Sequence, residues 1–463
     1  MGIKSVFLSA AMAVSVLGVT TQASLAETLA DAMAGAYTHS GLLEQNRALL
    51  RVADENVAQA TASLRPILSW SSELRRTFSD PSSAVNGTSA NLGLNLSWTL
   101  VDNGSKKLAR ERLKQTVLAT RESLVAVEQN VLLAAVRAFM DVRRDSEIVA
   151  LRQNNLRVIT RELRAAEDRF DVGEVTRTDV ALAQARLAGA RAELAVAQGN
   201  LMASNAAYAA AVGRKPSQLT PPSRLPSVAK TVAAAEAVAV RSHPDMKAAQ
   251  FQVAAADIGI KEADVSVIPS VDLSAGVSRQ NFLSGGTGDR SSGSVSIIAG
   301  GPIYSGGAIA SASRQAIANR DAARGGLHAT RHTIRQSVGF AWAQLLAARA
   351  QRVASGQQIK ASQVAFEGVR EEAKLGSRTT LDVLNAEQEL LDARANQITA
   401  QSAEFTAAYS LLASMGLLTV DHLNLAVEKY DPEAYYNQVQ SAPAALSKRG
   451  QQLDKVLRRI GKE

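Results

Sequence analysis

The 463-residue sequence contains an internal duplication. When it is shifted by 203 positions (269 − 66), Pro66 aligns with Pro269 and no gap is needed. The same shift aligns Phe139 with Trp342, Thr176 with Thr379, Asp179 with Asp382, and Gly213 with Gly416. This period is far longer than that of a solenoid repeat. The sequence therefore predicts one structural unit that occurs twice, over residues 27–227 and 228–430, with a proline-rich linker at 213–226.

The N-terminus has the features of a secretory signal peptide. Lys4 is the only charge before residue 27, an apolar run extends from Val6 to Val19, and small residues precede Glu27. We predict that residues 1–26 are a signal peptide cleaved after Ala26. An uncleaved anchor helix is the alternative, but the run is short for a bilayer span. No other stretch approaches about 20 consecutive apolar residues, so no transmembrane helix is predicted.

Composition narrows the class of protein further. The chain has 0 cysteines, which excludes both a disulfide framework and a lipidated N-terminal cysteine. The net charge is +8, but basic and acidic residues are interspersed along the predicted helices, so nucleic-acid binding is not predicted. Basic residues concentrate only after Lys448, within residues 431–463. We expect that segment to be a flexible tail that ends in a short basic helix.

Each repeat contains a very long helical segment. Residues 105–172 have neither proline nor glycine, enough for a helix of roughly 100 Å. The helix that follows has one seam with a seven-residue spacing, formed by Val180, Leu187, Leu194, Leu201 and Tyr208, with small residues at the interleaved positions. A second seam is nearly all small, formed by Ala181, Ala185, Ala188, Ala192, Ala195 and Gly199. Two seams predict a ring or layer of helices. Each repeat also opens with a helix broken at one place, Ser40-Gly41 or His243-Pro244.

Each repeat also contains two predicted β-strands. Between Ala90 and Val101 leucine and tryptophan alternate with asparagine, glycine, serine and threonine, and residues 271–278 alternate in the same way. Strands at 67–78 and 294–304 complete two hairpins with polar connections. Such alternation also fits a half-buried soluble sheet. Runs of about ten residues, apolar on one side and small-polar on the other, are typical of outer-membrane strands.

The number of strands has a consequence for assembly. Four strands per chain do not close around a lumen, and an open edge inside a bilayer leaves backbone groups without hydrogen bonds. The chain is therefore predicted to oligomerise. Two copies would give eight strands and three copies would give twelve.

The two long helices of each repeat meet at a short turn. It reads Val172 to Asp179 in the first repeat and Leu375 to Asp382 in the second. A glycine ends the incoming helix, and a threonine followed three residues later by aspartate forms a capping box for the outgoing helix. Helix capping alone is a sufficient explanation for both aspartates.

With these paired turns, two barrel hairpins and an export signal, the chain resembles the TolC family of outer-membrane efflux and secretion channels over roughly residues 27–431. The resemblance implies a homotrimer with a twelve-stranded barrel in the outer membrane, continuous with a long α-helical barrel in the periplasm. It implies a passive exit duct for tripartite efflux pumps or type I protein secretion. The implied partners are outer-membrane lipid, a periplasmic adaptor and an inner-membrane transporter of the ABC or RND type.

The resemblance also assigns gate residues. In such channels the first-repeat aspartate bonds an arginine of a neighbouring protomer, and the matching residues here are Asp179 and Arg378. A tyrosine of the same network is replaced by Ala373. Of two entrance aspartates, Asp382 is present and Asn385 replaces the other. We expect a gate with fewer bonds, a weaker acidic ring, and Asp382 carboxylates whose pKa values are raised by their mutual proximity.

The same resemblance places the adaptor at the turn tips, Val172-Gly173 and Leu375-Gly376, where glycine allows close backbone approach.

Other kinds of site are not predicted. His328 and His332 have helical i, i+4 spacing, but no glutamate or cysteine accompanies them, so a metal site is not expected. The glycine-rich loop at 284–288 lacks the lysine of a phosphate loop. We find no catalytic residues and expect neither an enzyme nor a cofactor. The alternative function is a periplasmic structural or adaptor coiled coil without a barrel, and the strand at 92–100 discriminates between the two.

Overall fold

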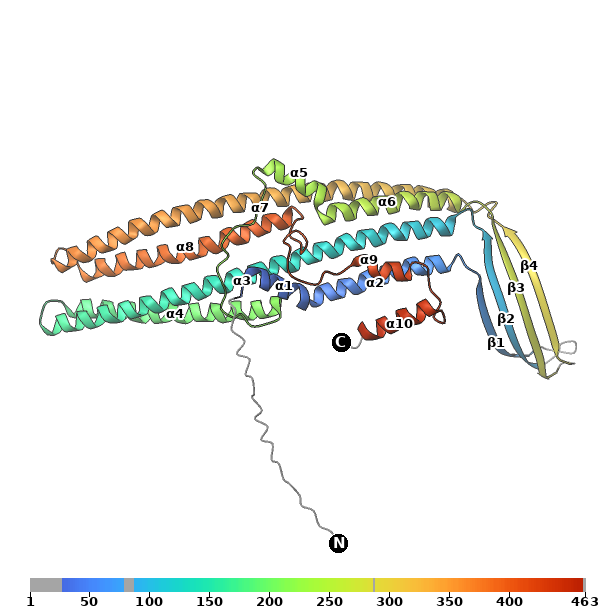
Figure 1. Cartoon of the computed structure of the whole chain (residues 1–463), viewed down its shortest axis with the longest axis horizontal. Coiled ribbons are helices and arrows are strands. Elements are labelled where there is room, and N and C mark those ends of the chain that lie inside the picture. Colours follow the sequence, from blue (N-terminus) through green and yellow to red (C-terminus); the bar gives the residue numbers. More distant parts are fainter. Residues whose placement is uncertain (1–26, 79–86, 286–287, 461–463) are drawn as a thin grey trace, which may run out of the picture.

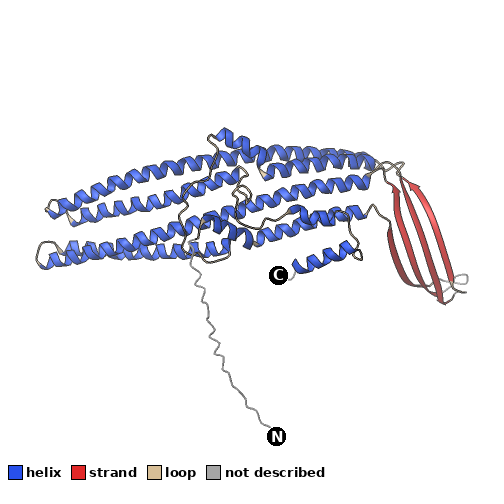
Figure 2. Cartoon of the chain, in the orientation of Figure 1, coloured by secondary structure: helices blue, strands red, loops and turns tan. Residues whose placement is uncertain are grey.

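The computed structural model describes residues 27–78, 87–285 and 288–460, and it is a long rod of helices with a β-sheet at one end (Figure 1). The predicted signal peptide and most of the first polar hairpin loop lie outside the described residues. The helices run side by side, and two helical hairpins end at the pole opposite the sheet (Figure 2).

The described residues confirm the duplication. The first repeat contains α1 (Leu29–His39), α2 (Gly41–Ala62), β1 (Ile67–Thr77), β2 (Gly87–Val101), α3 (Ser105–Asp171) and α4 (Arg177–Val212). The second repeat contains α5 (Val232–Ser242), α6 (Pro244–Val265), β3 (Ser270–Ser284), β4 (Arg290–Gly300), α7 (Ala308–Lys374) and α8 (Thr380–Ser414). The starts of α5, α6 and α7 follow those of α1, α2 and α3 by 203 residues each (232 − 29, 244 − 41, 308 − 105).

The predicted breaks in the opening helices are present. Ser40 ends α1 and caps α2, since its side chain accepts a hydrogen bond from the backbone N–H of Leu43. In the second repeat His243 occupies the same place, and Pro244 is the first residue of α6. A proline is tolerated there because its missing N–H would have no intrahelical partner.

The four strands form one antiparallel sheet in the order β1-β2-β3-β4. Its register aligns the alternation of all four strands. Leu94 lies opposite Trp70 of β1 and Val277 of β3, while the next residue, Asn95, lies opposite Ser69 and Gly276. One face of the sheet is therefore apolar and the other carries small polar side chains, as predicted.

The apolar face is uncovered. Trp70 is 73% exposed and Val295 is 77% exposed. In the described residues β1 and β4 each pair on one side only, so the sheet has two open edges. Such a sheet is stable in neither water nor lipid until its edges are paired.

The fourth strand differs from the predicted bounds of 294–304. It begins at Arg290 and ends at Gly300, because Pro302 has no N–H to donate to a strand ladder. Ile303 and Tyr304 consequently lie outside the sheet and are almost fully exposed.

The main core lies midway along the rod, where α3 packs against α1, α2 and α4. Phe139 and Tyr208 are fully buried there. In the described part of the chain α3 is the one helix with an 18-residue window apolar enough to cross a membrane, and 44% of that window is buried in this core. Burial in this core accounts for the apolar composition of α3. The sequence predicted no transmembrane helix and offered no reason for this apolar window.

The two seams predicted for α4 have different environments. The interleaved small positions of the first seam are buried against α3, at Ala183, Ala190, Ala197 and Ser204. The second seam is exposed along most of its length.

The C-terminal segment forms two helices, α9 (Pro432–Val439) and α10 (Lys448–Ile460). Helix α9 packs on α2, where the Tyr435 hydroxyl donates to Glu55 Oε1 over 2.6 Å. Arg121 of α3 pairs with Glu433 over 3.0 Å. The predicted basic helix is present as α10, and the expected flexibility of residues 431–463 stays a prediction.

Candidate functional site at the helical hairpin tips

The turn between α3 and α4 is built as the sequence predicts. Gly173 has φ +80°, in the left-handed region that glycine adopts without strain, and its N–H donates to Phe170 O. The Thr176 N–H donates to Asp179 Oδ2 over 2.9 Å, and the Asp179 N–H donates back to Thr176 Oγ1 over 3.3 Å. These bonds close a capping box.

The turn between α7 and α8 repeats this geometry. Gly376 has φ +78°, and Thr379 and Asp382 form the equivalent capping box. Val172 is 71% exposed and Leu375 is 86% exposed. Each tip therefore presents one apolar side chain to its surroundings.

Capping also sets the charge state of both aspartates. Hydrogen bonds from the side chain and backbone of Thr176 lower the pKa of Asp179, and those from the backbone and side chain of Thr379 lower the pKa of Asp382. Both carboxyls are therefore ionised at neutral pH within one protomer. The higher pKa expected for a ring of three Asp382 carboxylates concerns the assembled trimer and stays a prediction.

Arg378 does not reach Asp179 within the chain. Its Nε lies 2.8 Å from Glu372 Oε2, an ion pair on the surface of the second hairpin tip. Arg378 and Asp179 nevertheless line the same groove of about 540 Å³ between the two tips. Ala373, the position of the missing tyrosine, lines this groove as well. The bond between Asp179 and Arg378 of neighbouring copies stays a prediction.

Asn385 has a partner that the sequence did not reveal. Its Oδ1 accepts a hydrogen bond of 2.6 Å from Arg186 Nη2. Arg186 is on α4 and Asn385 is on α8, so this bond joins the two hairpins of one protomer. The sequence signal that could have found Arg186 is its spacing from Asp179. The two residues are seven positions apart and therefore lie on the same face of α4.

Two further contacts join the hairpins above this bond. Arg152 of α3 lies 2.7 Å from Glu193 of α4 and 3.8 Å from Asp392 of α8. A small apolar cluster of Ile159, Leu187 and Leu384 connects α3, α4 and α8. The hairpin tips are thus held together by polar and apolar contacts.

One buried carboxyl lies between the same helices. Glu387 of α8 is 9% exposed, and in the described residues it makes no hydrogen bond or ion pair. Burial raises the pKa of Glu387 to about 7, with a further contribution from the carboxylate of Glu162 on α3. An uncompensated carboxylate is costly to bury, so Glu387 opposes close contact of the hairpins when it is ionised.

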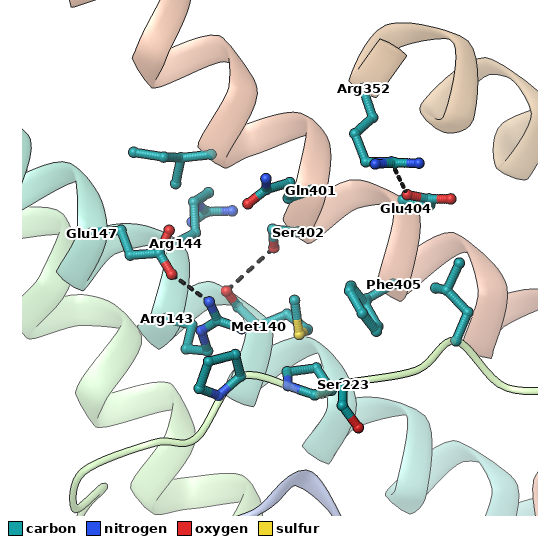
Figure 3. A pocket seen from close by; sticks show the side chains of 14 residues that line it. Met140, Arg143, Arg144, Glu147, Ser223, Arg352, Gln401, Ser402, Glu404 and Phe405 are labelled. Atoms are coloured by element: carbon teal, nitrogen blue, oxygen red, sulfur yellow. Dashed lines mark hydrogen bonds and ion pairs between the residues drawn. The ribbon is translucent and has the colours of Figure 1, made fainter. Parts of the chain in front are cut away.

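The two repeats are joined again near the middle of the rod, around a cavity of about 370 Å³ (Figure 3). The Ser402 hydroxyl of α8 donates to Met140 O of α3 over 3.2 Å. Arg352 pairs with Glu404 over 2.6 Å, and Arg143 pairs with Glu147. These charges have partners within the chain, and the contacts around the cavity hold α8 against α3.

In the described residues no group of three or more metal-ligating side chains comes together, and His328 and His332 belong to no such group.

A family model described as "Outer membrane efflux protein" matches residues 36–214 and again residues 238–417, one match in each repeat. Outer membrane efflux protein BepC of Brucella suis is 36% identical over 433 residues, which cover 93% of this chain and 94% of that protein. Outer membrane protein TolC of Vibrio cholerae is 25% identical over 429 residues, with coverage of 89% and 95%.

A solved structure has the same fold. The CmeC outer membrane channel of Campylobacter jejuni superimposes with a TM-score of 0.73 at 16% identity, and the match covers 90% of each chain. The similarity extends over both the sheet and the helical rod, which make up nearly all of the described residues.

Proposed function

This chain belongs to the outer membrane efflux protein family and is an outer-membrane exit duct for efflux, and on that premise we propose that it works as a homotrimer. Three four-stranded sheets would close into one twelve-stranded barrel, and the helices would form a tunnel through the periplasm. The observation that carries this proposal is the sheet, which has one uncovered apolar face and two open edges.

The two faces of the sheet support this arrangement. The row of Trp70, Leu94 and Val277 would face lipid, and the row of Ser69, Asn95 and Gly276 would line the lumen. Small side chains at these positions leave a wide, hydrated path, and further along the same face Glu73 and Arg75 carry opposite charges. The duct would therefore be passive, with transport driven by an inner-membrane transporter of the ABC or RND type.

We propose that the hairpin tips form the gate. Asp179 is ionised and partly exposed at one tip, and Arg378 is exposed at the other, held by a surface pair with Glu372. Exposed ion pairs are weak, so exchange of Glu372 for Asp179 of a neighbouring copy costs little. Asp382 lies at the same end and would contribute the acidic ring, while Asn385 is engaged with Arg186.

The outermost residues of the tips would receive the periplasmic adaptor. Val172 and Leu375 are exposed apolar side chains, each followed by a glycine with an uncrowded backbone. Two such pairs per chain would give six equivalent contacts around a trimer.

The native mass of the mature protein in detergent tests this function. A mass of three chains, with aggregation when detergent is removed, is the expected result. A monomer or dimer that stays in solution without detergent would mean that the sheet does not enter a membrane. In that case the alternative function, a periplasmic coiled coil without a barrel, would replace the exit duct. Family membership and the two-faced sheet favour the exit duct.

A further inference from the structure

A loop near the membrane end of the helical rod has no role in the duct described so far. It joins α9 to α10, and Leu446 near its end is 91% exposed. Lys448 and Arg449, the first residues of α10, are exposed as well. One exposed leucine is ordinary on a protein surface. Whether Leu446 has a function therefore depends on where the loop lies relative to the membrane.

Helix α9 leads toward the sheet. Near its middle Tyr435 bonds Glu55 of α2, and just beyond its end Arg65 Nη1 donates to Ala442 O over 2.8 Å. Residue numbers increase in the same direction on α2 and on α9 between these two hydrogen bonds, so the two helices run parallel. Arg65 lies two residues before β1. The end of α9 is therefore fixed close to the first strand.

Helix α10 then runs back along α9. Leu453 packs in one cluster with Val439 of α9 and Ala58 of α2. Lys448, at the start of α10, precedes Leu453 by five residues, which is about 7.5 Å along the helix. On α2, a similar distance from Ala58 toward the sheet reaches the end of the helix at Ala62. The loop and the first turn of α10 thus lie level with the point where α2 gives way to β1 (Figure 1).

A tryptophan of the sheet indicates that the membrane surface lies at the same level. Trp98 lies on the apolar face of the sheet, and its indole N–H donates to Leu64 O over 3.3 Å. Tryptophan is enriched where hydrocarbon meets water, with its ring in the apolar layer and its N–H bonded at the boundary. Leu64 therefore marks the periplasmic surface of the outer membrane.

The loop is held in one conformation by its own contacts. The Ser447 N–H donates to Ala444 O over 2.8 Å, and the Gly450 N–H donates to Ser447 Oγ over 3.0 Å. A Cβ at Gly450 would lie 2.2 Å from Ala444 O, so the loop folds directly onto the helix. Leu446 is therefore exposed in a compact turn with its own hydrogen bonds.

We propose that Leu446, Lys448 and Arg449 form a lipid-binding surface for anionic phospholipid in the periplasmic leaflet of the outer membrane. Lysine and arginine near a bilayer are attracted to anionic headgroups, and a neighbouring leucine gains by entering the acyl boundary. This surface would fix the tail, and through Arg65 the start of β1, to the membrane. The inference is independent of the gate at the opposite pole.

The chain has 0 cysteines, so a single spin label reports on one position without interference. The full-length variant Leu446→Cys is labelled and reconstituted into vesicles of phosphatidylcholine, or of equal parts phosphatidylcholine and phosphatidylglycerol. We expect the ratio of oxygen to nickel-chelate accessibility to be at least about twofold higher with phosphatidylglycerol. Adding Lys448→Glu and Arg449→Glu removes that difference.

Gln452 is exposed on the same helix about one turn further from the membrane, so Gln452→Cys is the matched control and shows no dependence on lipid. An unchanged native mass confirms that the charge-reversed variant is assembled. The same accessibility ratio at residue 446 in both vesicle types overturns the proposal. A label that is immobile and shielded from both reagents in both vesicle types also overturns it, because a neighbouring copy then covers this surface.

Discussion

Arg186 Nη2 donates a 2.6 Å hydrogen bond to Asn385 Oδ1 and thereby joins α4 of the first repeat to α8 of the second. The bond lies just above the capping boxes of Asp179 and Asp382. It therefore connects the two hairpins whose separation would open the end of the tunnel. Together with the apolar cluster of Ile159, Leu187 and Leu384, it would hold the hairpins in a closed arrangement.

Loss of this bond should favour the open state. Arg186→Ala removes an exposed hydrogen bond worth about 1 kcal/mol, which corresponds to roughly a fivefold shift between closed and open states. We expect greater entry of large antibiotics into cells that carry Arg186→Ala, measured as lower inhibitory concentrations at equal trimer levels. Arg191→Ala is the control, since Arg191 is exposed on the same helix and has no ion pair within the described chain. Equal sensitivity of both variants would show that the bond does not restrain opening.

Asp179 caps α4, and we propose that it also makes a gate contact with Arg378 of a neighbouring copy. Thr176→Ala and Asp179→Ala both weaken the capping box, at a cost of about 1 kcal/mol. Only Asp179→Ala also removes the negative charge. We expect antibiotic leak to rise for Asp179→Ala and to stay near the parental level for Thr176→Ala. If the two variants leak equally, capping accounts for the whole effect of Asp179.

The stability of the protein should depend on the protonation of Glu387. Its pKa in the folded chain is about 7, above the ordinary 4.5, because the carboxyl is buried and faces Glu162. The folded state therefore keeps this proton when the unfolded state has lost it, and stability falls as pH rises from about 4.5 to about 7. The loss is at most about 3 kcal/mol.

Thermal unfolding of the detergent-solubilised protein at pH 5 and pH 8 measures this effect. Glu387→Gln should raise the unfolding midpoint at pH 8 and reduce the difference between the two pH values. Glu389→Gln is the matched control, because Glu389 is exposed two residues away on α8. A pH dependence that Glu387→Gln leaves unchanged would mean that other groups cause it.

The two faces of the sheet should respond differently to the same charge. Leu94→Asp and Leu96→Asp place carboxylates on the apolar face, where a charge in the bilayer costs several kcal/mol, so outer-membrane trimers should be lost. Asn95→Asp places a carboxylate between them on the polar face, and trimers should form normally. Fractionation of membranes followed by native electrophoresis measures both. Trimers of the Leu94 and Leu96 variants would refute the assignment of the lipid-facing side.

The sequence predicted most of the architecture because the responsible signals are local. Helix length follows from the absence of proline and glycine between residues 105 and 172, and the faces of the strands follow from a strict alternation. The broken opening helices and both capping boxes follow from short motifs. The fourth strand was placed too far toward Tyr304, since the apolar residues Ile303 and Tyr304 follow Pro302, which cannot continue the pairing.

The duplication, the long helices, the two-faced strands and the capped turns were determined by the sequence itself, because each depends on residues that are neighbours along one element. Only the tertiary structure decided which residues meet across elements. Arg186 reaches Asn385 and Glu387 faces Glu162 because α3, α4 and α8 pack side by side. The antiparallel return of α10 brings Leu446 level with Trp98. Contacts of this kind depend on distances between segments far apart in the chain, and no local pattern of residues encodes those distances.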